Sequence, residues 1–253
     1  MSRITLIGGL HAVQSALRYD PTRVTEIWLD RRRRDARLQK LRRQVAELHC
    51  KVHEADARTL DDKLPGANHQ GVVLAWQGQA PRGDVELADH LDGLGHPPLL
   101  LVLDQVQDPH NLGACLRTAD AAGVDAVITP RDRAVGLTPV VHRVAAGAAE
   151  IVPLFQVTNL ARCLRDLRDR GIWLFGLAEE GATTFHGADL TGAVAVVMGA
   201  EGKGLRRLTR EHCDTLVAIP MAGRVESLNV SVATGVVLFE AVRQRQAFAW
   251  PSG

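Results

Sequence analysis

The sequence is poor in aromatic residues and in cysteine, and it has no long apolar segment. It contains one Tyr, five Phe and four Trp, fewer than is usual in proteins that read single-stranded nucleic acid by base stacking. The four cysteines are far apart and form no Cys-x-x-Cys pair, so their spacing favours reduced thiols over a zinc site or a disulfide framework. Because neither a signal-peptide core nor a run of about 18 apolar residues occurs, we expect a cytoplasmic chain without a membrane partner.

The net charge of +1 gives no sign of a nucleic-acid partner, but the charge is unevenly distributed. Residues 1–76 contain 14 Lys/Arg and 9 Asp/Glu, whereas residues 77–253 contain 16 and 20. A basic first part and a mildly acidic second part favour an RNA-binding module joined to a domain of another kind. A run of four arginines stands beside a basic helical pattern and is either solvated surface or a contact to RNA phosphates. We expect the phosphate contact, through Arg31, Arg32, Arg33 and Arg34.

The hydrophobic pattern predicts two domains. Residues 1–76 form a small α/β unit, and residues 77–97 form a linker whose first part holds two Gly and a Pro without periodicity. Residues 98–253 alternate apolar runs with helical patterns, which predicts a parallel sheet covered on both faces. Expected strands are 24–29, 51–54, 71–76, 99–104, 126–129, 151–153, 172–177, 193–198 and 216–219, and expected helices include 112–122, 138–145, 160–168 and 230–243.

A first candidate site lies between Asp104 and Arg117, where an apolar strand ends and a helix follows. Asn111 is placed either to cap this helix or to act in a site. Arg117 stands among apolar residues, so its guanidinium needs an anionic partner. From the residues alone, a phosphate or substrate group and an internal carboxylate are both open, although ligands of parallel sheets bind at the carboxyl ends of strands.

A second candidate is the glycine-rich turn from Met198 to Gly204, which follows an apolar strand and contains Glu201. Its spacing fits neither the dinucleotide fingerprint nor the P-loop, because Gly204 stands where a P-loop needs Ser or Thr. Glycines allow a ligand to approach the backbone closely. Taken alone, however, this turn is more often a tight connection between two elements than a binding site.

A third candidate runs from Ile219 to Ser231. Ser227, Asn229 and Ser231 alternate at the expected start of an apolar helix, which is more polar side chains than one cap requires. A helix N-terminus also presents backbone N–H groups that have no partner within the helix. A capping cluster and a ligand site explain this segment equally well.

Taken together and in this order, residues 108–117, 198–204 and 219–231 resemble the three signature motifs of one enzyme family. This is the SpoU (TrmH-like) branch of the SPOUT superfamily, the RNA ribose 2′-O-methyltransferases. The resemblance covers most of the chain, and the three motifs are specific as a set although each alone is not. Within the family, the chain resembles the bacterial members that methylate a guanosine in the P loop of 23S rRNA.

The resemblance implies an architecture that composition does not reveal. Family members have a C-terminal parallel-sheet α/β domain closed by a trefoil knot, which general rules of topology treat as an exception. A small ribosomal-protein-like (L30e-like) α/β domain that binds RNA precedes it. The resemblance further implies S-adenosylmethionine as cofactor, no metal, a homodimer with the site near its interface, and 23S rRNA or a large-subunit assembly intermediate as partner.

Carried over position by position, the resemblance assigns catalytic roles to Asn111, Arg117, Glu201, Ser227 and Asn229. It assigns cofactor binding, largely through backbone groups, to Gly199, Ile219 and Leu228. The third motif departs from the family at Arg224 and Glu226, where smaller residues are expected. These departures affect local RNA contacts and leave the polar side chains in place.

Arg117 has been proposed as the base of this family, but arginine stays protonated in proteins. We expect Arg117 instead to bind an RNA phosphate and to stabilise the negative charge that develops on the 2′-oxygen. Asn111, Ser227 and Asn229 would orient the guanidinium and the ribose. Glu201 would hold its loop or pair with Arg117.

Two alternatives remain. The same reaction on tRNA is one, since motifs of the catalytic domain do not choose the RNA. The other is a non-catalytic RNA-binding or ribosome-assembly factor on the same fold. This alternative predicts that the residues with assigned catalytic roles have been replaced. All of them are present in this sequence: Asn111, Arg117, Glu201, Ser227 and Asn229.

Overall fold

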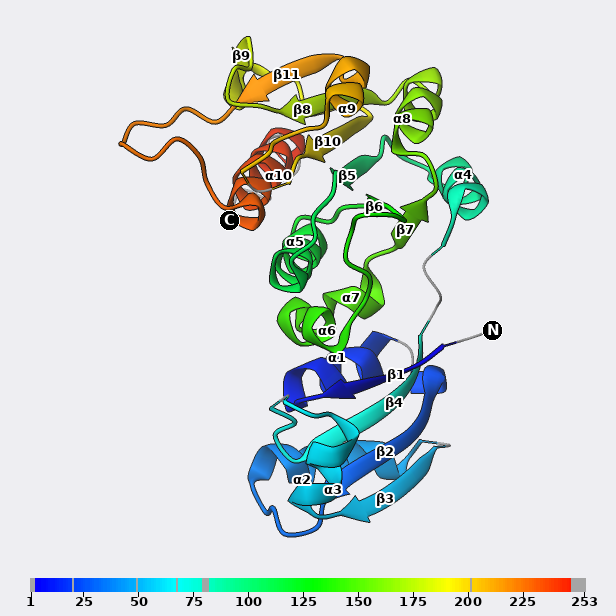
Figure 1. The fold of residues 1–253 in the computed structure, drawn as a ribbon. Helices are drawn as coiled ribbons and strands as arrows, with labels where there is room; N and C mark the ends of the chain where they lie inside the picture. The colour runs from blue at the N-terminus through cyan, green and yellow to red at the C-terminus, as the bar shows by residue number, and fades with distance from the viewer. Residues whose placement is uncertain are drawn as a thin grey trace, which may run out of the picture. The chain divides into compact units, whose positions relative to one another are not determined.

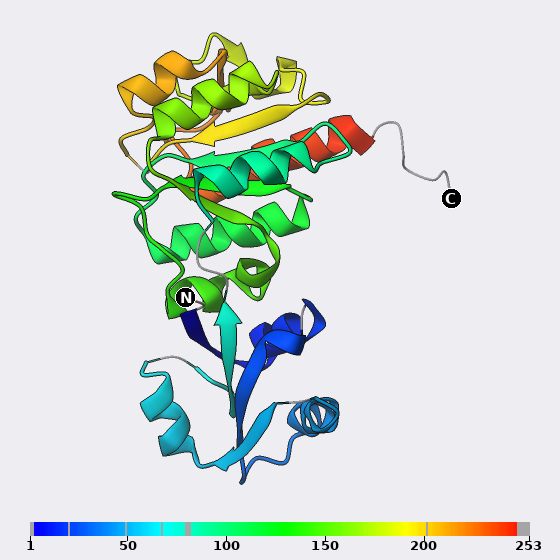
Figure 2. The same cartoon turned by 90° about the vertical axis from the view of Figure 1, so that its right-hand side faces the viewer.

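The computed structural model describes residues 3–19, 21–48, 50–66, 68–78, 82–200 and 202–246. The chain divides into two compact units, whose elements Figures 1 and 2 show from two sides. The first unit comprises Met1–Ala80 with Leu137–Ile151, and the second comprises Pro81–Gly136 with Val152–Gly253. This division differs from the predicted one, because residues 137–151 fall in the first unit and the expected linker at 77–97 contains a helix.

The first unit is built on a four-stranded sheet of order β1-β4-β2-β3. The strands are β1 (Arg3–Gly8), β2 (Val24–Asp30), β3 (Lys51–Ala55) and β4 (Val72–Gly78). Strand β4 pairs antiparallel with β1 and β2, and β2 pairs parallel with β3. The sequence predicted three of these strands and missed β1.

The helices of the first unit are α1 (Leu10–Tyr19), α2 (Ala36–Ala46), α3 (Ala57–Lys63), α6 (Pro139–Ala145) and α7 (Ala148–Ile151). Helix α2 has an apolar face, since Leu38, Leu41 and Val45 are buried in one cluster with residues of the sheet and of α1. Asp35 caps this helix by accepting a hydrogen bond of 3.1 Å from the Leu38 N–H. The basic residues of α2 are thereby left on its outer face.

The second unit contains a seven-stranded sheet of order β7-β6-β5-β10-β8-β11-β9. Its strands are β5 (Leu99–Leu103), β6 (Ala126–Pro130), β7 (Leu154–Val157), β8 (Trp173–Leu177), β9 (Thr183–Thr184), β10 (Val194–Met198) and β11 (Thr215–Ala218). All pairings are parallel, as predicted. The strand predicted at 151–153 is wrong. Ile151 ends α7, and β7 begins after Pro153, which has no N–H for a strand ladder.

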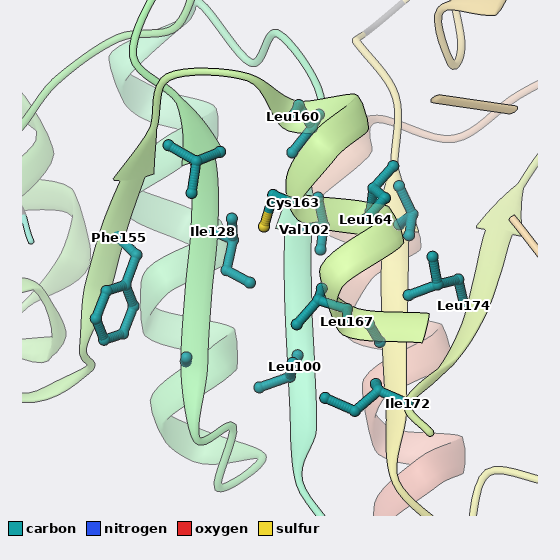
Figure 3. Packing of buried hydrophobic residues seen from close by; sticks show 14 of the residues in the cluster. Leu100, Val102, Ile128, Phe155, Leu160, Cys163, Leu164, Leu167, Ile172 and Leu174 are labelled. Atoms are coloured by element: carbon teal, nitrogen blue, oxygen red, sulfur yellow. The ribbon is translucent and has the colours of Figure 1, made fainter. Parts of the chain in front are cut away.

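Helices cover both faces of this sheet. They are α4 (Asp84–Asp92), α5 (Pro109–Ala121), α8 (Leu160–Asp169), α9 (Arg207–His212) and α10 (Val230–Gln246). Figure 3 shows α8 across one face, where Leu160 and Leu164 share a buried cluster with Leu100 and Val102, while α5 and α10 lie behind the strands. Every residue of β5 and β10 is buried, which explains why both strands read as continuous apolar runs.

The end of α10 is fastened to two loops of the second unit. Gln244 accepts a hydrogen bond of 2.8 Å from the Leu190 N–H, and Arg245 donates one of 3.1 Å to the Pro98 carbonyl. Glu240 accepts hydrogen bonds from Arg243 and Gln244. The Arg243 guanidinium holds the pKa of the Glu240 carboxyl at about 2, below its ordinary value of 4.5. The ionised carboxylate therefore stabilises the folded helix end.

Replacing this carboxylate should give a stability loss that depends on pH. Because the folded-state pKa is the lowered one, the stabilisation is complete above pH 4.5 and is lost as the pH falls towards 2. Because the Arg243 side chain of this pair is 68% exposed, solvent screens the interaction, and Glu240→Gln should lower the free energy of unfolding at neutral pH by about 1 kcal/mol. Urea denaturation across pH measures it. Glu211→Gln, which breaks an exposed pair with Arg207, is the control, and equal losses in both variants would contradict the assignment.

The cysteines are all free thiols. Burial raises the pKa of Cys115 to about 11 and the pKa values of Cys163 and Cys213 to about 12. Cys115 lies in α5 with its sulfur 3.6 Å from the Thr234 hydroxyl of α10. These three thiols remain protonated and unreactive at neutral pH.

Candidate active site

A cavity of about 710 Å³ opens at the carboxyl ends of three adjacent strands, β10, β8 and β11. Residues that follow each strand line it, at 177–180, 198–200 with 202–205, and 218–221 with 226–228. Val230 and Ala233, at the start of α10, complete the wall. Both the size and the position are those of ligand sites in parallel α/β sheets. The second and third candidate segments of the sequence thus meet in one cavity.

The glycine-rich turn after β10 is closed on itself. Ala200 and Gly204 exchange two backbone hydrogen bonds, of 3.2 and 2.9 Å, and Gly202 and Gly204 have φ of +72° and +62°. A Cβ at Gly199 would overlap the Gly204 carbonyl and the Leu205 nitrogen. Glycine is therefore required at 199 by the approach of two backbone segments. The turn is a tight connection, and it also lines the cavity.

A buried carboxylate holds the exit of this turn. Asp104 is fully buried at the end of β5 and accepts hydrogen bonds of 3.1 Å from the Arg206 N–H and 2.6 Å from its guanidinium. The Asp104 N–H donates in turn to the Met198 carbonyl at 2.8 Å. The two ends of the turn are thereby tied to β5, which fixes the backbone that faces the cavity.

Asn229 joins the starts of two helices. Its amide nitrogen donates to the Asn111 side-chain oxygen at 3.0 Å, and its own oxygen accepts from the Ser231 N–H at 2.9 Å and the Ser231 hydroxyl at 2.6 Å. Asn229 is thus both the cap of α10, which begins at Val230, and the partner of Asn111. The alternative in which Asn111 caps α5 is excluded, because Asp108 accepts the His110 N–H there at 2.9 Å. Asn111 lies in the first turn of α5 and is largely buried.

Arg117 lies in α5 with its side chain exposed. Within the part of the chain that the structure describes, it forms no hydrogen bond or ion pair, so the internal ion pair left open by the sequence is not made there. Arg117 does not line the cavity. An exposed guanidinium on the helix that carries Asn111 is available to an anionic ligand.

The remaining predicted residues fall into three groups. Gly199, Ile219, Ser227 and Leu228 line the cavity. Glu201 lies outside the described residues. The arginine run belongs to the loop between β2 and α2 in the first unit, and all four side chains are exposed. Arg33 pairs with Asp35 at 2.6 Å, and Arg31 approaches Asp56 at 3.6 Å.

The sequence did not reveal the charged wall of the cavity. Glu179 and Glu180, after β8, line it together with Lys203 and Arg210, and Arg210 is paired with Glu180. The predicted strand at 172–177 could have pointed to these residues, because they follow its end, but that end was not predicted to be part of the site. Its importance follows from the sheet order, which places β8 between β10 and β11.

Two features are absent from the described part of the chain. It contains no group of three or more His, Cys, Asp or Glu side chains arranged to hold a metal ion. None of its helices is both long enough and apolar enough to span a membrane.

Comparison with known families identifies this arrangement. Residues 98–239 match the SpoU rRNA Methylase family, and residues 6–79 match the RNA 2′-O ribose methyltransferase substrate binding family. The chain belongs to the SpoU rRNA methylase family and is a methyltransferase. The resemblance predicted from the three motifs is confirmed.

Individual relatives match over nearly their whole length. The chain is 55% identical to a Pseudomonas putida protein named 23S rRNA (guanosine-2′-O-)-methyltransferase RlmB, over 97% of this chain and 99% of the relative. A Ralstonia nicotianae protein of the same name is 54% identical over 97% and 98%. Among solved structures, the SpoU methyltransferase AviRb of Streptomyces viridochromogenes in complex with AdoMet gives a TM-score of 0.81 at 25% identity, covering 96% and 90% of the two chains.

Proposed function

We propose that this protein transfers a methyl group from S-adenosylmethionine to the ribose 2′-hydroxyl of a specific guanosine of 23S rRNA, in the P loop of the peptidyl-transferase centre. The observation that carries the proposal is the match of both units to relatives named for this reaction, at 55% identity over 97% of the chain. The cavity at the ends of β8, β10 and β11 supplies the site.

The cavity fits S-adenosylmethionine chemically. Apolar side chains at Met198, Ile219 and Leu228 suit the adenine ring, whereas carboxylates and cations in the same wall suit the sulfonium, ammonium and carboxylate groups. Gly199 gives the bare backbone that a closely bound cofactor needs. When bound, the cofactor supplies a methyl group already activated by its positive sulfur.

The chain's own task is to place the ribose hydroxyl and to favour loss of its proton. Arg117 stays charged, binds the neighbouring phosphate and stabilises negative charge on the 2′-oxygen. Asn111 and Asn229, joined by their amide hydrogen bond, set the ribose and the helix that carries Arg117, and Ser227 contacts the ribose from the cavity wall. Glu201 holds the glycine-rich turn or pairs with Arg117.

The two parts of the chain have separate roles in this proposal. Residues 1–76 bind the RNA substrate, with Arg31, Arg32, Arg33 and Arg34 contacting phosphates, and the second unit carries the catalytic site and the C-terminal knot. The knot stays a prediction from family membership. The substrate is mature 23S rRNA or a large-subunit assembly intermediate, and the protein acts in the cytoplasm.

An rRNA substrate is favoured over tRNA by the extent of the matches. A structure titled for 2′-OH methylation of C/U34 on tRNA covers only 60% of this chain, at 31% identity. The relatives named for 23S rRNA cover both units. An assay with tritiated S-adenosylmethionine decides: we expect incorporation into a 23S rRNA transcript that carries the P loop and none into tRNA. Incorporation into tRNA alone would contradict the proposed 23S rRNA substrate. Incorporation into neither RNA would favour the alternative of a non-catalytic RNA-binding or ribosome-assembly factor.

We infer that the protein is a homodimer that pairs through α10. Val232, Val236 and Phe239 form an apolar stripe at helical spacing, and they remain 51%, 36% and 49% exposed. A stripe of this kind on a helix that begins at the cavity marks a protein interface close to the site.

Phe239→Asp should convert a dimer into a monomer, because a carboxylate would be buried in the apolar contact. Light scattering after size-exclusion chromatography measures the mass. Val85→Asp, which changes an exposed valine of α4, is the matched control and should remain dimeric. If the Phe239→Asp variant stayed dimeric, the interface would lie elsewhere than on α10. If the parent protein were a monomer, the inference of a homodimer would be wrong.

A further inference from the structure

A second cavity, of about 510 Å³, lies in the second unit at the carboxyl ends of β6 and β7. Its walls are the loop after β6 with Asp132 and Arg133, the first turn of α8 at residues 158–161, and the start of α9 at residues 206–209. None of the three motifs predicted this site. The proposed methyl transfer does not require it.

One chain segment separates the two cavities. Gly204, Leu205 and Arg210 line the cavity at β10, whereas residues 206–209, between them, line the second one. The two sites are therefore neighbours across the start of α9. A strand of RNA that occupied both cavities would pass over the start of α9.

The second cavity is lined by three arginines and one acid. Arg206 is already neutralised by the buried Asp104, with its guanidinium 2.6 Å from the carboxylate. Arg207 is 82% exposed and pairs at 3.1 Å with the exposed carboxylate of Glu211, one turn further along α9. Arg133 has no hydrogen-bond or ion-pair partner among the residues that the structure describes. The Arg133 guanidinium is thus open to an anion, and the exposed pair of Arg207 with Glu211 is weak enough for an anion to replace it.

The backbone around these arginines also favours an anion. Arg133 has φ of +58°, a conformation that non-glycine residues seldom adopt and that is concentrated at ligand sites. Leu160 and Ala161 line the cavity at the start of α8, where N–H groups lack partners within the helix. The cap of this helix, Asn159, is occupied by the Arg162 N–H at 3.1 Å. Cationic side chains and helix N–H groups therefore converge on one space.

We propose that this cavity binds a backbone phosphate of the RNA substrate, at a nucleotide next to the methylated one, through Arg133 and Arg207. The inference rests on the proposed function, since RNA is the source of the phosphate. Arg206 fixes the start of α9 through Asp104 and thereby positions Arg207. Guanidinium groups suit this ligand because their paired N–H donors match two phosphate oxygens.

The test combines Arg133→Gln and Arg207→Gln, singly and together, with Arg165→Gln as the control. Arg165 is exposed on α8 and lines neither cavity. Its replacement by Gln removes the same charge from the same unit. We expect the double variant to raise KM for the 23S rRNA transcript about 10- to 30-fold, and to lower the slope of log Kd against log salt by about one per arginine. The S-adenosylmethionine affinity and the control should match the parent protein.

Other outcomes overturn the inference. Equal KM values and salt slopes in the double variant and in Arg165→Gln would show that no phosphate is bound there. A loss of S-adenosylmethionine affinity would assign the arginines to the cofactor loop. Inorganic phosphate that binds the parent protein, with an unchanged KM for RNA in the variants, would make the cavity a free-anion site. A parent protein that methylates no RNA would refute the proposed function instead, so the two failures are distinguishable.

Discussion

Arg117→Ala should lower kcat by a factor on the order of 10² to 10³ while the affinity for S-adenosylmethionine stays unchanged. The guanidinium is exposed on α5, has no partner in the described part of the chain and lies outside the cavity wall. Its removal should therefore leave the cavity wall intact and remove the cation that we propose to face the ribose and its phosphate. Single-turnover methyl transfer, with cofactor binding measured separately, tests both parts.

Arg117→Lys distinguishes a cationic role from a base. Because lysine keeps the charge but not the planar pair of donors, we expect only a small part of the activity to return, with an unchanged pH–rate profile. Nearly full activity in Arg117→Lys would contradict bidentate positioning. A profile displaced by several pH units would favour a deprotonated side chain as base. Arg165→Ala, on α8, controls for the loss of one exposed arginine.

Gly199→Ala should weaken S-adenosylmethionine binding by about 10- to 100-fold. The added Cβ would overlap the Gly204 carbonyl and the Leu205 nitrogen, both of which are backbone atoms that cannot rotate away. The turn must open, and the hydrogen bonds between Ala200 and Gly204 must lengthen. Calorimetric titration with the cofactor measures the loss.

Gly192→Ala is the matched control for this substitution. Gly192 precedes the same strand, β10, and a Cβ there meets no atom within 4 Å. Cofactor affinity in this variant should equal that of the parent protein. If Gly199→Ala also binds normally and folds with the same stability, the closed turn does not form the cofactor site.

Local pattern predicted the second sheet well and the short elements poorly. The strands β5 and β10 are buried along their whole length, so their continuous apolar runs were sufficient to predict them as strands. The helix α4 was missed because only Leu87 of its nine residues is fully buried. The error at 151–153 has a different origin, since Ile151 is apolar and yet ends the short helix α7, and β7 begins only after Pro153.

The site was only partly predictable because it depends on sheet order. Motifs around Gly199 and Ser227 meet only because β10 and β11 flank β8, and nothing local in the sequence specifies that arrangement. The sequence drew attention to the polar residues at 227–231, but their separate contacts required coordinates: Asn229 caps α10 and also donates a hydrogen bond to Asn111. Family resemblance supplied the reaction, which no spacing of residues could have given.

The most direct measurement of the central claim is a map of 2′-O-methylation in 23S rRNA from a strain that lacks this gene. The account predicts that one guanosine of the P loop loses its methyl group. It further predicts that the intact gene restores the mark and that an Arg117→Ala copy does not. A 23S rRNA that keeps every 2′-O-methyl mark in the deletion strain would contradict the proposed function.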